Sequence, residues 1–179
     1  MRQFLFLQAS ARSGGNAASL ARLAAEALTD AAQDWRDLTD PALPPFTDLR
    51  HGASYGAPGP VAEDLARATL AASDLVFVAP LYWYGLPAPA KLYLDHWSHW
   101  MRVPGLDFTA RMAGKRMWLV MSHAGSAPAE IAPAVEGLKL AAAYLGMVWG
   151  GTLLVDANAP GQWRDDGAAL AQARGFFDL

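Results

Sequence analysis

Cysteine is absent from the 179 residues of this chain. Its absence excludes disulfide bonds and every form of thiolate chemistry, whether catalytic, metal-binding or redox-sensing. Long apolar runs are also missing: no stretch reaches the eighteen or so consecutive apolar residues that a membrane-spanning helix needs. The N-terminal segment 1–8 is too short and turns polar too soon for a signal peptide. We therefore expect a cytoplasmic protein with no membrane partner.

Charge is scarce and mixed in sign. Lys and Arg number 14 and Asp and Glu 17, which gives a formal net charge of -3. The basic residues are scattered and form no stripe, so nucleic acid is not expected as a partner. The chain shows no internal repeat and no low-complexity linker, and its length suits one domain that spans residues 1–179.

Short apolar runs alternate with segments of helical periodicity, the pattern of β-α-β units and a parallel sheet. The apolar runs predict buried strands at 4–7, 75–79, 117–121 and 152–155, and the charged run 34–38 predicts an edge strand. The periodic segments predict helices at 16–32, 60–72, 87–101, 128–145 and 164–177. Asn16 is a candidate N-cap and Gly146 a C-terminal stop. The fold class is therefore a doubly wound α/β domain.

Ligands of open parallel sheets bind beyond the carboxyl ends of the strands. The first loop at that edge is segment 10–16, which offers Ser10, the guanidinium of Arg12, Gly15 and a helix N-terminus. Such a turn is typical of an anion site, because free backbone N–H groups and flexible glycines can approach phosphate oxygens. The segment matches neither G-x-G-x-x-G nor the G-x-x-x-x-G-K-[ST] motif, which favours a monophosphate. A plain glycine turn capped by Asn16 is the alternative.

The second loop, segment 80–88, places Tyr82, Trp83 and Tyr84 in a row between prolines. Neighbouring side chains of a loop cannot all face the core, so these rings indicate a planar ligand or a partner surface. Packing against the following helix or against a dimer partner is the alternative. The third loop, segment 122–126, is small and polar and would let a ring edge reach backbone amides. By itself it is typical of an ordinary turn.

Asp95, His96 and His99 on the third helix have a spacing compatible with a metal site. Two imidazoles and one carboxylate at the wrong helical phase make a poor ligand set, and we favour a solvated helix end. The interleaved Trp97 and Trp100 favour core or dimer packing.

Three segments resemble one known family. Segment 80–91 followed by Asp95 resembles the flavin loop of the flavodoxin-like NAD(P)H oxidoreductases, which include quinone reductases and NADPH-dependent FMN reductases. Ser10-Ala11-Arg12 with Asn16 resembles their phosphate loop, and segment 41–46 resembles another recurring segment. The resemblance covers most of residues 3–155. The third loop departs from the family, which commonly has Thr and Gly pairs there.

The resemblance implies a flavodoxin-like, three-layer α/β/α fold with a five-stranded sheet of order 2-1-3-4-5. It implies FMN as cofactor, with FAD possible, NAD(P)H as co-substrate, and a quinone, free flavin or similar small acceptor. It also implies a homodimer with the flavin near the interface. No catalytic acid or base is required. The implied cofactor-binding residues are Ser10, Arg12, Gly15, Asn16, Ala17, Pro80, Leu81, Tyr82, Trp83, Tyr84, Gly85, Ser122, His123, Ala124 and Gly125.

Two other functions remain open at this point. A flavodoxin-type electron carrier would use the same fold, but such carriers tend to be strongly acidic, and a net charge of -3 speaks against one. A non-catalytic binding module on the same fold is the second alternative, because a fold alone does not establish an activity.

Overall fold

A parallel sheet forms the centre of the computed structural model, which describes residues 1–52 and 55–177. Its strand order is β2-β1-β3-β4-β5, and all four pairings are parallel. The strands are β1 (Gln3–Gln8), β2 (Ala32–Asp37), β3 (Asp74–Pro80), β4 (Arg116–His123) and β5 (Val148–Asp156). This arrangement confirms the predicted fold class and strand order.

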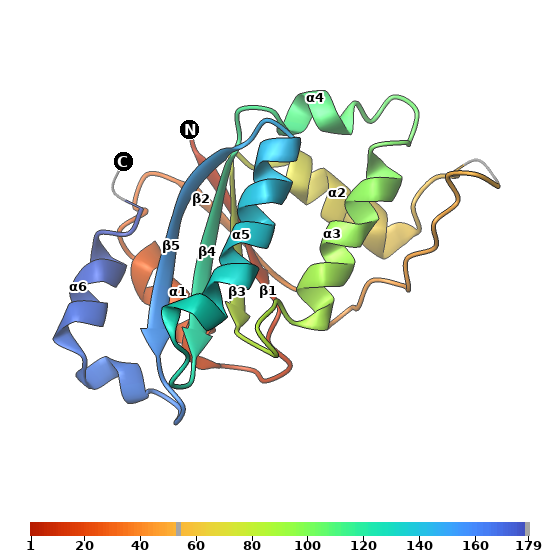
Figure 1. The fold of residues 1–179 in the computed structure, drawn as a ribbon. Coiled ribbons are helices and arrows are strands. Elements are labelled where there is room, and N and C mark those ends of the chain that lie inside the picture. The colour runs from red at the N-terminus through yellow and green to blue at the C-terminus, as the bar shows by residue number, and fades with distance from the viewer. Residues whose placement is uncertain (53–54, 178–179) are drawn as a thin grey trace.

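Helices cover both faces of the sheet, as Figure 1 shows. One face carries α1 (Asn16–Ala25) and α6 (Gly167–Arg174), and the other carries α2 (Pro60–Ala71), α3 (Ala88–Trp100) and α5 (Pro128–Tyr144). Successive strand residues point to opposite faces, so Leu5 packs in one core cluster and Phe6 in the other. Burial on both sides explains why the central strands are continuous apolar runs.

Several boundaries differ from the prediction. The first helix ends at Ala25 instead of Ala32, where the Gln33 side-chain amide donates to the Ala25 carbonyl. The alanines that follow keep a helical spacing, but most of that stretch is exposed and therefore gains little from packing as a helix. The expected helix 164–177 is split into a 3₁₀ turn, η1 (Gln162–Asp165), and α6. The side chain of Asp166 divides them by capping α6.

A short helix that the sequence did not predict, α4 (Phe108–Met112), packs its buried Phe108 and Met112 on the α3 side of the sheet. No helix within the described ranges has both the length and the apolar character to cross a membrane.

Gly150 permits the close approach of β5 to Trp118 on β4. A Cβ atom at position 150 would lie 2.4 Å from ring atoms of Trp118, which is 1% exposed and cannot retreat. We therefore expect Gly150→Ala to lower the free energy of unfolding by about 1–3 kcal/mol, the range for an overpacked core. Gly137→Ala, in a helix with open space at the added Cβ, is the matched control and should be stabilising. Equal urea midpoints for the two variants would contradict this account.

Candidate functional site

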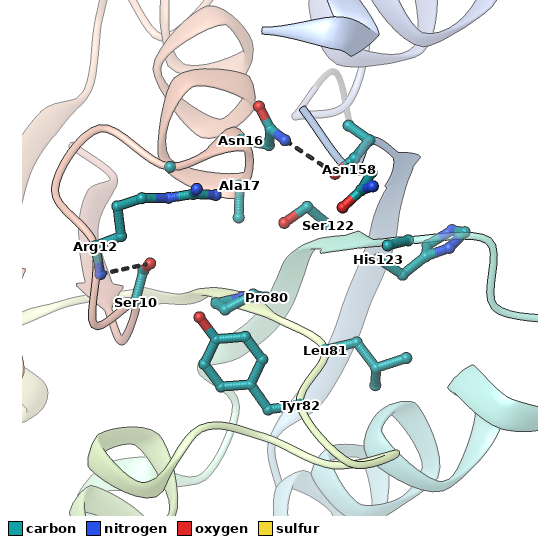
Figure 2. Close-up of a pocket in the computed structure, with 13 residues that line it drawn as sticks. Ser10, Arg12, Asn16, Ala17, Pro80, Leu81, Tyr82, Ser122, His123 and Asn158 are labelled. Carbon is teal, nitrogen blue, oxygen red and sulfur yellow. Dashed lines mark hydrogen bonds between the residues drawn. The ribbon is translucent and has the colours of Figure 1, made fainter. Parts of the chain in front are cut away.

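A cavity of about 150 Å³ opens at the carboxyl ends of β1, β3, β4 and β5 (Figure 2). Four loops form its wall, and three of them are the loops singled out in the sequence. The predicted residues on the wall are Ser10, Arg12, Gly15, Asn16, Ala17, Pro80, Leu81, Tyr82, Ser122, His123 and Ala124. Ala157 and Asn158 also line it and were not predicted. The predicted residues Trp83, Tyr84, Gly85 and Gly125 do not line this cavity.

The first loop presents the start of α1 to the cavity. Gly15 is the N-cap, with extended backbone (φ −63°, ψ 168°) and no side chain to accept the first N–H groups of the helix. Those N–H groups have no acceptor within a helix and carry the positive end of its dipole. The Arg12 backbone N–H donates to Ser10 Oγ at 3.2 Å, and Figure 2 shows the Arg12 side chain reaching toward Ala17. This end of the cavity is therefore suited to an anion.

Asn16 does not cap α1, so that prediction was wrong. It is the first residue of the helix, only 4% exposed, and its side chain is turned toward the loop after β5. Its Nδ2 donates to the carbonyls of Ala157 and Ala159 at 3.0 and 3.1 Å, and its Oδ1 accepts the Gly161 N–H at 2.8 Å. Both amide hydrogens are used in these bonds. Asn16 can therefore donate to an anion in the cavity through its backbone N–H.

The second loop is a tight two-residue turn. Tyr82 and Gly85 exchange two backbone hydrogen bonds of 3.0–3.1 Å, and Trp83 and Tyr84 between them have φ angles of +48° and +63°. Glycine and asparagine are the usual residues in such a turn, and other residues are strained there. The three rings are exposed by 46%, 92% and 53% in sequence order, which confirms that they do not all face the core. Tyr82 borders the cavity, and Trp83 and Tyr84 do not line it.

The third loop is fastened to its neighbours by backbone contacts. The Ser122 carbonyl accepts the Leu81 N–H at 2.8 Å, and the His123 carbonyl accepts the Ala157 N–H at 2.8 Å. Asp156 Oδ1 accepts the Gly125 N–H at 2.9 Å and lies 4.0 Å from His123 Nδ1. These contacts fix the spacing between the second, third and fourth walls of the cavity.

The two histidines of α3 bond to backbone carbonyls of the segment between β2 and α2. His96 Nε2 donates to the Pro44 carbonyl and His99 Nε2 to the Gly56 carbonyl, both at 2.9 Å. His96 is 4% exposed, so the expectation of a solvated helix end was wrong there. Trp97 and Trp100 are buried in the core, as predicted. Across residues 1–52 and 55–177, no three His, Cys, Asp or Glu side chains are grouped closely enough to hold a metal.

Comparison with known proteins supports one family. A family model described as the flavodoxin-like fold matches residues 2–175. The chain is 30% identical over 166 residues to a Bacillus subtilis protein provisionally named NAD(P)H-dependent FMN-containing oxidoreductase YwqN, covering 90% of this chain and 89% of that protein.

Solved structures share the fold at lower identity. The Trp repressor binding protein of Bacillus subtilis superposes with a TM-score of 0.76 at 24% identity, covering 97% of this chain and 96% of that one. An azoreductase of Bacillus anthracis gives 0.72 at 19% identity and covers 100% of both chains. The NAD(P)H:quinone oxidoreductase of Methanothermobacter marburgensis gives 0.72 at 16% identity, covering 99% and 98%. The chain belongs to the flavodoxin-like family of NAD(P)H-dependent oxidoreductases.

Proposed function

We propose that this protein is an NAD(P)H-dependent flavin oxidoreductase that binds FMN in the cavity and reduces a quinone, free flavin or similar small acceptor. The observation that carries the proposal is that one cavity is lined both by the start of α1, which is suited to an anion, and by Tyr82 of the exposed aromatic turn. The FMN-containing relative from Bacillus subtilis supports it.

The donors of the cavity fit the parts of FMN. The glycine N-cap and the single arginine suit one phosphate group, whereas a pyrophosphate is usually held by a glycine-rich dinucleotide motif that this loop lacks. Segments 80–82 and 122–124 supply the walls for a flat ring, with the small residue Ala124 and the backbone of His123 at its edge. The residues present are therefore compatible with the cofactor.

The protein contributes position and surroundings to the reaction. FMN, when bound, supplies the hydride chemistry between nicotinamide and acceptor. Two backbone hydrogen bonds between Tyr82 and Gly85 close the turn of residues 82–85, which holds Tyr82 at the cavity. Such fixed aromatic surfaces orient planar reactants next to one another, which lowers the entropic cost of reaction. No side chain is required to transfer a proton.

We further propose a single-domain cytoplasmic homodimer that has neither nucleic acid nor membrane as a partner. Exposed apolar side chains support self-association, above all Trp83 at 92%, Leu140 at 71% and Tyr144 at 76%. Light scattering after gel filtration should give twice the mass of 19.1 kDa. A monomer at micromolar concentration would reject the dimer and leave the reductase proposal standing.

Replacing Arg12 by alanine should weaken FMN binding about tenfold and leave riboflavin binding unchanged. A hydrogen bond to a charged group contributes about 1.5–3 kcal/mol, and exposure of Arg12 places the effect near the lower end. Fluorescence titration of the apoprotein with each flavin measures both affinities. Arg12→Lys should recover part of the FMN affinity because it keeps the charge. If Arg12→Ala lowered the affinities for FMN and riboflavin equally, Arg12 would not be a phosphate-binding residue.

Steady-state oxidation of NADH and NADPH tests the activity itself. With FMN-loaded protein, nicotinamide oxidation should depend on an added quinone, azo compound or free flavin, and the best acceptor should stand out by kcat/KM. A flavodoxin-type carrier would bind FMN and show no turnover with either nicotinamide.

A further inference from the structure

The loop that follows β5 forms the fourth wall of the cavity and is held in place from three sides. Asn16 makes its three hydrogen bonds to residues 157–161. Gln162 Oε1 accepts the backbone N–H groups of Asn158 and Ala159 at 2.9 and 3.0 Å. On the other side, the Ala157 N–H donates to the His123 carbonyl. The backbone of this loop is thus fixed relative to the first and third loops.

The side chain of Asn158 projects from that fixed backbone toward the cavity. Figure 2 shows its amide group on the side of the cavity formed by Asn16 and Ser122, with the Ser122 hydroxyl also directed inward. Among the residues that the structure describes, neither the exposed Asn158 amide nor Ser122 Oγ, in a residue only 7% exposed, has a hydrogen-bond partner. Two polar side chains, both directed into one cavity from hydrogen-bonded backbone, are available to a ligand.

We infer that Asn158 binds the ribityl chain of the flavin and that Asn16 is a positioning residue which acts through it. The inference rests on the proposed function. Figure 2 shows Asn158 next to Ser122, on the side of the cavity away from Arg12, so its amide lies beyond the anion end. The part of FMN that adjoins its phosphate is a chain of hydroxyl groups, each a donor and an acceptor, and a side-chain amide offers both.

The hydrogen bonds of Asn16 are those of a residue that positions a distant loop. An asparagine that only capped α1 would bond to its own first turn, whereas this one uses all its amide hydrogens on residues more than 140 positions away. These bonds place the fourth wall against the phosphate loop. Loss of Asn16 should therefore move Asn158 and weaken the contact that Asn158 makes.

Three flavins and two variants test the contact directly. Apoprotein is titrated with FMN, with riboflavin, which lacks the phosphate, and with lumiflavin, which lacks the ribityl chain. Asn158→Ala should lower the affinities for FMN and riboflavin by the same factor of about three to ten, the effect of about one neutral hydrogen bond. The affinity for lumiflavin should not change. Asn158→Asp, which adds a negative charge, should weaken FMN more than riboflavin.

A double-mutant cycle tests the positioning role of Asn16. Asn16→Ala should weaken riboflavin, and its effect should largely vanish in the Asn158→Ala background if Asn16 acts through Asn158. Thermal unfolding of each variant shows whether the fold is kept, and Asn158→Ala alone remains informative if Asn16→Ala does not fold. Additive effects of the two substitutions on riboflavin would overturn the positioning role.

The remaining outcomes separate this inference from the proposed function. Unchanged riboflavin affinity in Asn158→Ala, with tight FMN binding by the wild-type protein, would overturn this inference alone. If Asn158→Ala lowered the affinity for lumiflavin as much as the affinity for riboflavin, the ribityl chain would not be the group that Asn158 contacts. Failure of the wild-type protein to bind any of the three flavins would overturn both the inference and the proposed function.

Discussion

A Gly15→Asp variant is expected to lose FMN affinity by at least about a hundredfold and yet to unfold at the same or a higher temperature. Gly15 is the N-cap of α1, and its backbone angles are accessible to any residue. Aspartate is among the best N-cap residues, because its carboxylate accepts the first free N–H groups of the helix. Those are the N–H groups that the proposed phosphate site requires, so the substitution stabilises the helix and occupies the site.

Charge repulsion adds to that competition. At an effective dielectric constant near 20, the repulsion energy between a carboxylate and a phosphate charge about 4 Å apart is about 4 kcal/mol. The added Cβ would lie 3.3 Å from Ser10 Oγ, a hydroxyl that can rotate away, so steric strain is a small part of the loss. Calorimetric titration with FMN and thermal unfolding measure the two effects separately.

Gly15→Asn is the matched control for this prediction. Asparagine caps a helix about as well as aspartate and has the same shape, but it carries no charge. It should therefore retain clearly more FMN affinity than the aspartate variant. Equal FMN affinities for the two variants would show that no anion binds at the start of α1.

Replacement of Asp74 by alanine is expected to lower the free energy of unfolding by about 2–4 kcal/mol. Asp74, at the start of β3, is fully buried and accepts hydrogen bonds from Arg2 at 2.6 and 3.1 Å, Ser73 at 2.7 Å and Trp118 Nε1 at 3.0 Å. Its loss leaves the buried indole N–H without an acceptor. The expected loss of stability is smaller than for breaking a fully buried ion pair, because the Arg2 side chain is 30% exposed and can be rehydrated.

The same contacts give this stabilisation a definite pH dependence. Burial by itself raises the pKa of Asp74, but hydrogen bonds from Arg2, Ser73 and Trp118 outweigh it and hold the pKa below its ordinary value. Because the folded pKa is the lower one, the stabilisation is complete above the ordinary pKa of about 3.9 and is lost as the pH falls through the folded pKa. The stability difference between wild type and Asp74→Asn should therefore shrink below about pH 4.

Urea unfolding at a series of pH values measures this dependence, and FMN affinity serves as the control. Asp74 is at the amino end of β3 and the cavity is at the carboxyl end, so flavin binding by the folded variants should not change. A stability difference that stays constant from pH 7 to pH 3 would show that the Asp74 carboxylate is not the stabilising group.

The sequence could predict the strands and the three loops because each leaves a local signal. Residues 75–79 are a continuous apolar run since helices cover both faces of β3. The carboxyl ends of such strands then point to one edge, which placed Arg12, Tyr82 and Ser122 around one cavity. The strand order came from the family resemblance and not from the pattern of residues.

The role of Asn16 and the part played by Asn158 left no such local signal. The partners of Asn16 are 141 or more residues away, so no spacing rule indicates them, and an asparagine before an apolar helix is typical of an N-cap. Asn158 belongs to a loop whose position depends on those same bonds. The left-handed backbone of Trp83 and Tyr84 was equally hidden, because aromatic residues rarely adopt it.

The most direct test of the account is the visible absorption spectrum of the protein with FMN under anaerobic conditions, before and after addition of NADH or NADPH. FMN is expected to remain with the protein through gel filtration, and one of the two nicotinamides should bleach its visible absorption band, which a quinone then restores. Bound FMN that neither nicotinamide bleaches, or FMN that separates from the protein, would contradict it.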